Sequence, residues 1–214
     1  MRASDTREQL LDAAAKGFTE SGFEATSISD LAAEVGIDES SAHELFESKQ
    51  ELWDVALERA LERFDAAAQA LDLDVADPVG AAADYRDLDH DHLADVAEKL
   101  FDFYLHEPAV VALRRMLALE QFRDPNAAKI LRQRFIQRPL RYQETLFVRM
   151  FGVASGEGEH LALGFWGPIH LLLKLAQEDE PRARAVLRKH TKAFVAYLSG
   201  AENLLGPWTS PGSG

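Results

Sequence analysis

The chain has 214 residues and carries a formal net charge of −13. Its length and its hydrophobic content of 47% are typical of a folded globular protein with a substantial core. It contains no cysteine, which excludes disulfide bonds and thiolate metal sites. The N-terminal residues lack the apolar core of a secretory signal, and the longest apolar stretch, residues 161–176, is interrupted by His170 and Lys174. We therefore expect a cytoplasmic protein without a membrane partner.

Helical periodicity recurs along the chain, whereas no stretch alternates apolar and polar residues in the manner of a half-buried strand. We therefore predict an all-α protein with about nine helices. The predicted helices cover residues 5–21, 27–34, 39–45, 49–71, 89–106, 108–121, 125–151, 158–177 and 180–199.

Two stretches lack this periodicity. Residues 72–88 form an acidic connection, and residues 201–214 have the composition of a flexible tail. Pro139 and Pro168 fall inside helical patterns, where proline removes a backbone donor. Each of these prolines predicts either a kink or the restart of a helix.

Residues 27–46 have the pattern of a helix-turn-helix. Ser27 precedes Asp30 and a series of apolar residues at helical spacing, which predicts a capped helix. Gly36 interrupts this helix where a tight turn needs a left-handed backbone, and Asp38 is a suitable N-cap for a second short helix. In such a motif the second helix is the candidate for a DNA major groove.

The helix-turn-helix and its flanks together carry four spaced motifs. These are Leu11-Asp-Ala-Ala-Ala-Lys-Gly-Phe18, Ser21-Gly-Phe-Glu-Ala-Thr-Ser-Ile28, Asp30-Leu-Ala-Ala-Glu-Val-Gly36 and Phe46-Glu-Ser-Lys-Gln-Glu-Leu52. In this order they resemble the DNA-binding domain of the TetR family of one-component bacterial regulators, and the resemblance extends over residues 6–66.

The resemblance implies an N-terminal helix-turn-helix domain of three helices, residues 1–48, followed by a helical ligand-binding and dimerisation bundle, residues 49–200. It also implies a homodimer that binds a double-stranded DNA operator, and a repressor that a small hydrophobic or amphipathic effector releases. No catalytic or cofactor-binding motif appears, so the sequence predicts neither an enzyme nor a cofactor.

Six residues are candidates for contact with DNA. Ser40, Ser41 and His43 lie on the second helix of the motif and are candidates for base or phosphate contacts. Thr26, Ser27 and Lys49 would position the DNA backbone through hydroxyl groups, a helix N-terminus and a positive charge.

The second helix departs from the family pattern in its charge. Between Ser27 and Glu47 there are six acidic residues and no lysine or arginine, and His43 stands where the family has a tyrosine. Affinity for DNA comes largely from cations that replace counterions at phosphates. An alternative hypothesis is therefore a degenerate helix-turn-helix dimer that acts through a ligand or a protein and binds DNA weakly or not at all.

The resemblance also implies that aromatic and apolar residues beyond position 100 form a ligand pocket in the helical bundle. The candidates are Phe101, Tyr104, Met116, Phe122, Phe147, Phe165, Trp166 and His170. The alternative for each of them is a place in the hydrophobic core.

The last two predicted helices are rich in leucine, and the resemblance implies that such a pair forms the dimer interface. The interface candidates are Leu161, Leu171, Leu172, Leu187 and Phe194. Burial of these side chains within one protomer is the alternative.

Two charged clusters remain. Asp87-Leu-Asp-His-Asp-His92 contains metal-binding side chains, but adjacent residues do not share a helical face, so we predict a solvated loop and no metal site. The arginines between residues 114 and 141 could hold an anionic effector, although pairing with acidic residues of the preceding segment is favoured.

Overall fold

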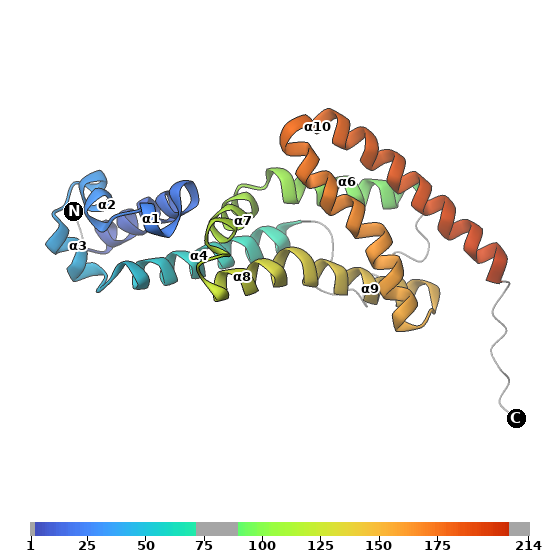
Figure 1. Ribbon diagram of the computed structural model, residues 1–214, viewed down its shortest axis with the longest axis horizontal. Helices are drawn as coiled ribbons and strands as arrows, with labels where there is room; N and C mark the ends of the chain where they lie inside the picture. The colour runs from blue at the N-terminus through green and yellow to red at the C-terminus, as the bar shows by residue number, and fades with distance from the viewer. Residues whose placement is uncertain (1–2, 72–89, 206–214) are drawn as a thin grey trace, which may run out of the picture. The chain divides into compact units, whose positions relative to one another are not determined.

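Figure 1 shows the computed structural model, which describes the backbone of residues 3–71 and 90–205 and the side chains of residues 5–71 and 94–198. Across these ranges the chain is helical and contains no strand, which confirms the all-α fold class. The elements are α1 (Ala3–Ala25), α2 (Ile28–Val35), α3 (Glu39–Leu45), α4 (Lys49–Ala70), α6 (His90–His106), α7 (Pro108–Glu120), α8 (Pro125–Arg132), a π-helical turn (Gln133–Gln137), α9 (Arg138–Phe151) and α10 (Ser155–Leu205). None of the helices described is long and apolar enough to cross a membrane.

Residues 3–71 and 106–138 of the described chain form one compact unit. In this unit α1 packs against α2, α4 and α7, and α2 packs against α3. Phe18 of α1 and Trp53 of α4 are buried and meet edge to face, with 5.2 Å between their ring centroids. This contact fixes α1 on α4 and thereby supports the short helices α2 and α3.

Residues 90–105 and 139–205 form a second compact unit, which contains α6, α9 and α10. Phe101, Phe147, Phe165, Ile169 and Leu187 are fully buried in it. Burial of each such side chain stabilises the folded state by about 1.5–3 kcal/mol. The three helices therefore share one apolar core.

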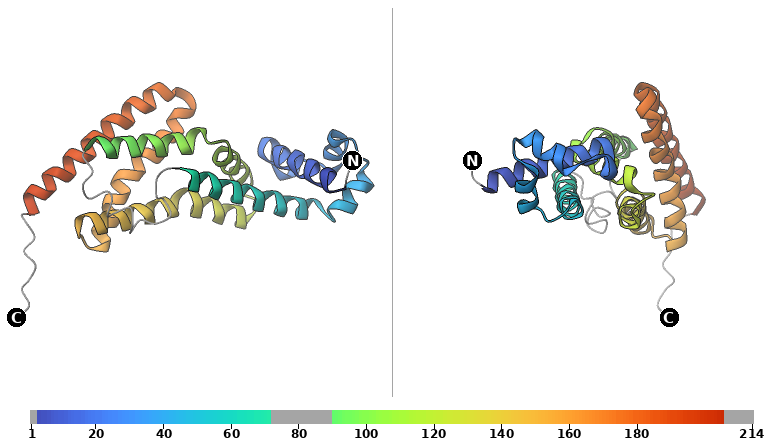
Figure 2. Two further views of the ribbon diagram at one scale, coloured as in Figure 1. Left: turned by 180° about the vertical axis from the view of Figure 1, so that it is seen from behind. Right: turned by 60° about the vertical axis from the view of Figure 1, so that its left-hand side comes forward.

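Helix α10 consists of two helical segments joined at Asp179, whose φ of −145° and ψ of 80° are not helical. The Asp179 side chain accepts a hydrogen bond from the backbone N–H of Arg182 at 3.0 Å, which caps the second segment. Figure 1 and Figure 2 show the resulting sharp bend. Pro168 lies within the first segment, so the chain bends at Asp179 and not at this proline.

The single helix predicted for residues 125–151 is divided in the structure. Between α8 and α9 the backbone widens into the π-helical turn, in which Arg138 N–H donates to Gln133 O. Pro139 follows directly and cannot donate to the carbonyl four residues earlier. The interruption expected at Pro139 thus takes the form of a π-helical turn, a rare form that occurs mostly as a single turn inside α-helices.

The two compact units divide the chain differently from the predicted functional domains. The structure groups α4, α7 and α8 with the N-terminal helices, whereas the sequence led us to assign everything after residue 48 to one bundle. The predicted boundary at residue 48 separates a DNA-binding domain from a ligand-binding domain, and this functional division stays a prediction. Three stretches lie outside the described residues: the acidic connection, the start of the Asp87–His92 cluster, and residues 206–214. Helix α10 extends to Leu205, into the segment that we predicted to be a flexible tail.

Candidate functional site

The turn between α2 and α3 has the geometry expected for a helix-turn-helix. Ser27 Oγ accepts a hydrogen bond from Asp30 N–H at 3.0 Å and caps α2. At the other end Gly36 has φ 76° and ψ 31°, a left-handed conformation that glycine adopts without strain. Gly36 N–H donates to Ala33 O and Ile37 N–H donates to Ala32 O, which together form a Schellman motif.

Asp38 begins α3 as its N-cap. Its Oδ1 accepts from Ser41 N–H at 2.8 Å and from the Ser40 hydroxyl at 2.5 Å. These bonds, first that from Ser40 and then that from Ser41, lower the pKa of Asp38 below its ordinary value of 3.8, because they stabilise the ionised carboxylate. The two predicted serine contacts therefore also serve the local structure of α3.

The outward face of α3 presents Glu39, Ser40, His43 and Glu44, which are all exposed, whereas Ala42 is buried. We call these four exposed residues the α3 surface. Glu39 Oε1 lies 3.9 Å from His43 Nε2, one helical turn away. The α3 surface thus offers a hydroxyl, an imidazole and two carboxylates to a partner.

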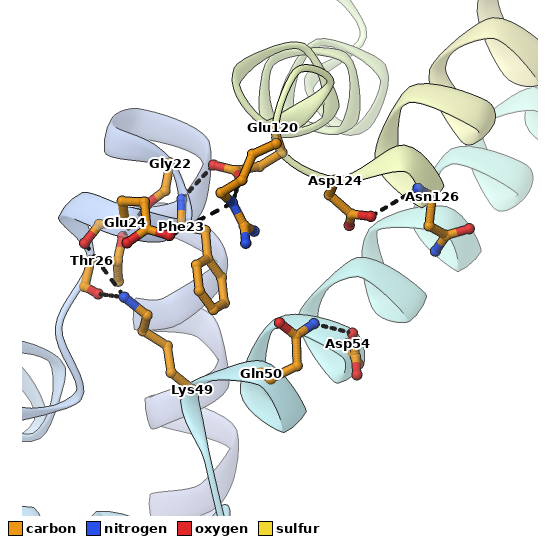
Figure 3. Close-up of polar contacts among 11 residues, drawn as sticks. Gly22, Phe23, Glu24, Thr26, Lys49, Gln50, Asp54, Glu120, Asp124 and Asn126 are labelled. Carbon is orange, nitrogen blue, oxygen red and sulfur yellow. Dashed lines mark hydrogen bonds and ion pairs between the residues drawn. The ribbon is translucent and has the colours of Figure 1, made fainter.

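Two of the predicted DNA contacts are occupied within the protein (Figure 3). Thr26 is only 5% exposed, and its hydroxyl donates to Gly22 O at 2.8 Å. Lys49 Nζ donates to Thr26 O at 3.0 Å and lies 4.4 Å from the centroid of the Phe23 ring. A DNA contact by either side chain would require these interactions to open.

The other cations described in residues 5–71 also have partners within the protein. Arg7 stacks over the Phe46 ring at 4.4 Å, and Lys16 pairs with Glu34 at 3.4 Å. Arg59 pairs with Glu8 and Asp12, and Arg63 pairs with Asp12 at 3.5 Å; these three ion pairs join α4 to α1. With Lys49 included, every lysine and arginine in residues 5–71 has an intramolecular partner.

A buried carboxylate connects α7 to the end of α1, and sequence reasoning did not identify it (Figure 3). Glu120 is 4% exposed; it accepts from Phe23 N–H at 2.7 Å and from Arg123 Nε at 2.6 Å. Gly22 makes this approach possible: its φ of 80° favours glycine, and a Cβ there would lie 2.9 Å from Glu120 Oε1. We call Gly22, Phe23, Glu120 and Arg123 the Glu120 cluster.

The sequence contains a signal for the burial of Glu120, although not for its partners. Leu113, Met116, Leu117 and Glu120 recur at helical spacing and are all buried, so the acidic residue continues an apolar face. A carboxylate in such a position needs hydrogen-bonding partners.

The predicted pocket residues fall into two groups. In the unit of α6, α9 and α10, Tyr104 and Trp166 are in contact at 5.3 Å between centroids, and Phe147 and Phe165 at 5.9 Å. Phe101 is buried in the same unit, and His170 is half-buried. The structure therefore brings a buried aromatic group together on these three helices.

The remaining two pocket candidates belong to the other unit. Met116 is buried in α7, 1% exposed. Phe122 follows α7 and is 95% exposed, because the chain turns there and directs this ring to solvent. The structure does not bring Phe122 into an enclosed aromatic group.

The predicted interface residues are mostly internal. Leu187 is fully buried, and Leu161, Leu172 and Phe194 are at most 8% exposed. Leu171, in contrast, is 70% exposed. Helix α10 also exposes Leu163, which belongs to the leucine-rich pattern, and Val186 and Tyr197, which sequence reasoning passed over.

Comparison with known proteins identifies the N-terminal region. Residues 10–55 match the family described as bacterial regulatory proteins, tetR family. No curated protein matches the chain.

Solved structures share the fold over nearly the whole chain. A candidate TetR-family regulator from Mesorhizobium loti is 18% identical, with a TM-score of 0.60 over 94% of this chain and 98% of that chain. A transcriptional regulator from Rhodococcus is 19% identical, with a TM-score of 0.55 over 91% and 96% of the two chains. A TetR-family regulator from Streptomyces coelicolor is 16% identical, with a TM-score of 0.53 over 94% and 84%. The chain thus carries the N-terminal domain of the TetR family of bacterial regulatory proteins and has the all-α fold of TetR-family transcriptional regulators.

Proposed function

We propose that this protein is a homodimeric, DNA-binding transcriptional repressor that a small hydrophobic or amphipathic effector releases from its operator. The observation that carries the proposal is the helix-turn-helix: α2, the Schellman turn at Gly36 and the capped helix α3 lie within the matched residues 10–55. The outward face of α3 is exposed, as the face of a helix that enters a major groove must be.

Recognition by the α3 surface would depend on hydrogen bonds more than on positive charge. Ser40 and His43 can donate or accept at base edges, and Ser41 lies beside them on the same helix. Glu39 and Glu44 can accept from the amino group of cytosine, the base-edge contact open to a carboxylate. Ser27 at the N-terminus of α2 remains a candidate for a phosphate.

A dimer would place two α3 helices in successive major grooves. The exposed apolar residues of α10, Leu163, Leu171, Val186 and Tyr197, support self-association. A two-fold interface uses the same surface of both copies, so the exposed apolar face of α10 in one protomer could pack against the same face in its partner.

An effector would act by stabilising a conformation in which the two α3 helices no longer match the DNA. Its influence is limited to the difference between its affinities for the two conformations. The buried aromatic side chains shared by α6, α9 and α10 support an apolar effector.

Fluorescence anisotropy with the DNA that flanks the protein's own gene tests the proposal. We expect binding with a shallow salt dependence, because the slope counts the phosphates that cations neutralise and the cations of residues 5–71 are already paired. Glu39→Lys should strengthen binding to a scrambled duplex more than to the operator, since added charge is sequence-independent. Glu178→Lys, an equal change of charge at an exposed position of α10, is the control and should have little effect.

A second candidate function is a degenerate helix-turn-helix dimer that responds to a ligand or a protein without binding DNA. The intramolecular pairing of every lysine and arginine in residues 5–71 favours this alternative. If neither the unmodified protein nor Glu39→Lys binds any duplex at low salt, the repressor proposal fails and this alternative replaces it.

A further inference from the structure

Two polar atoms in the core of the α6–α9–α10 unit have no hydrogen-bonding partner. They are Oε1 of Gln143 on α9 and Nε1 of Trp166 on α10. The side chains are buried, 3% and 2% exposed, so bulk solvent does not compensate for the missing bonds. Buried polar groups in folded proteins are nearly always paired, and the exceptions call for a physical explanation.

Each of the two side chains lies close in sequence to a buried aromatic contact. Gln143 lies one helical turn before Phe147, whose ring contacts Phe165 at 5.9 Å between centroids. Trp166 follows Phe165 along α10 and packs edge to face on Tyr104 of α6 at 5.3 Å. The core of this unit thus contains an unpaired donor on α10 and an unpaired acceptor on α9.

The chemistry of the two atoms defines a complementary group. The indole N–H of Trp166 can only donate, and the amide oxygen of Gln143 can only accept. A hydroxyl group can accept from the first and donate to the second. A carboxylate cannot donate, an ammonium cannot accept, and a hydrocarbon leaves both atoms unpaired.

Charge also disfavours an anionic ligand. The arginines that join α10 to α6 are already paired: Arg184 with Asp102 at 2.5 Å and Arg188 with Glu98 at 3.1 Å. A buried carboxylate would have to break such a pair or remain uncompensated.

We infer that Gln143 and Trp166 are the polar anchors of a binding site for a small apolar molecule with one uncharged hydroxyl group, such as a phenol. Tyr104, Phe147 and Phe165 supply the apolar surroundings. The inference rests on the proposed function, because it names the effector class. His170, one turn after Trp166 and half-buried, indicates that the protein surface is close to this site.

Nuclear magnetic resonance of the ¹⁵N-labelled full chain tests the site with 2-naphthol as the probe. Naphthalene and 2-naphthoate are matched controls with the same rings. The Trp166 indole resonance is identified as the one absent from Trp166→Phe. We expect 2-naphthol to shift it in the direction of a stronger hydrogen bond, naphthalene to leave that hydrogen bond unformed, and 2-naphthoate to bind at least tenfold more weakly than 2-naphthol.

Two apolar variants separate a binding role from a structural one. Gln143→Leu removes the acceptor at nearly unchanged side-chain volume, whereas Trp166→Phe removes the donor together with part of the ring. Each should weaken 2-naphthol binding about 5- to 15-fold, and Gln143→Leu should leave the affinity for naphthalene unchanged. Gln143→Leu should keep or raise the melting temperature of the free protein, because it removes an unpaired buried atom. Trp166→Phe should lower the melting temperature, because the smaller ring leaves a void in the core.

Several results would overturn the inference. These are no binding of 2-naphthol, equal affinity for 2-naphthol and naphthalene, a large drop in melting temperature for Gln143→Leu, or a long-lived water molecule that cross-relaxes with the Trp166 indole. DNA binding is measured separately by anisotropy. If 2-naphthol shifts the Trp166 resonance but the protein binds no DNA, the ligand site is supported and the repressor proposal is rejected. If the protein binds DNA but the resonance does not shift, the repressor proposal stands and the ligand site is rejected.

Discussion

Gly36 shows how a single backbone conformation determines the helix-turn-helix. Its φ of 76° disfavours any residue with a Cβ, although a Cβ there would contact nothing within 4 Å. Gly36→Ala should therefore lower the free energy of unfolding by about 1–2 kcal/mol through backbone strain alone. Gly36→Asn should cost less, because asparagine tolerates the left-handed region better. Urea denaturation followed by circular dichroism measures both.

A glycine on α10 provides the matched control. Gly164 is also exposed, and a Cβ there would meet only the Phe194 ring at 3.7 Å, an ordinary van der Waals distance, but it lies inside a helical segment. Gly164→Ala should stabilise the protein by about 0.5–1 kcal/mol, because alanine loses less backbone entropy in a helix. Equal effects at the two glycines would contradict the role of the left-handed backbone at Gly36.

Asp38 adds a pH dependence to the same motif. Its pKa in the folded protein is lowered from the ordinary value of 3.8 by the Ser40 and Ser41 bonds. Stabilisation by the ionised carboxylate is therefore complete above about 3.8 and is lost as the pH falls through the lowered pKa. Asp38→Asn keeps an acceptor but no charge. Its melting temperature should lie below that of the unmodified protein at neutral pH and approach it in acid, and a constant difference would refute this prediction.

These local features could be predicted from the sequence because they depend on a few neighbouring residues. The caps at Ser27 and Asp38 and the turn at Gly36 require only a suitable residue at the right place in a helical pattern. The Glu120 cluster could not be predicted in this way. Its bond from Phe23 N–H spans 97 residues of sequence, and no local pattern specifies that pairing.

At the scale of elements, the Glu120 cluster ties α7 to the end of α1, just before the helix-turn-helix. Glu120→Ala should lower the free energy of unfolding by about 2 kcal/mol, because Phe23 N–H and Arg123 lose a buried acceptor. The loss of stability is limited, because the Arg123 side chain is 37% exposed and water can solvate its charge when Glu120 is removed. Urea denaturation measures the loss, and amide hydrogen exchange should become faster at Phe23.

Arg123 itself offers the control. It also lies 3.8 Å from Glu24, whose side chain is 77% exposed. Glu24→Ala should change the free energy of unfolding by less than about 0.5 kcal/mol, as is usual for an exposed ion pair. If Glu120→Ala cost no more than Glu24→Ala, the cluster would not be a stabilising connection between α1 and α7.

At the scale of the whole molecule, hydrophobic spacing could not separate the core of one protomer from a surface shared by two. Leu171 and Leu172 are neighbours in a leucine-rich helix, and both fitted the predicted interface. The structure exposes 70% of Leu171 and 6% of Leu172, because adjacent residues on a helix point in different directions. The packing of α10 against α6 and α9 decides which leucines are internal, and that packing is not local in sequence.

The difference in exposure between Leu171 and the buried leucines of α10 provides a test of dimer formation. If the exposed apolar residues of α10 form an isologous interface, the unmodified protein should be a dimer by light scattering at micromolar concentration. Leu171→Glu should weaken the dimer roughly 10- to 100-fold, because it places two unpaired charges in an apolar contact. The helical circular dichroism spectrum should be retained, since Leu171 contributes little to the protomer core.

Leu187→Glu distinguishes association from folding. Leu187 is on the same helix but fully buried, so a carboxylate there should unfold or aggregate the protein instead of giving a folded monomer. Tyr197→Glu, at a position 59% exposed, should resemble Leu171→Glu because Tyr197 belongs to the exposed set. A folded dimer that persists in both exposed variants would place the interface elsewhere. A monomeric unmodified protein would remove the two-fold arrangement on which recognition of two half-sites depends.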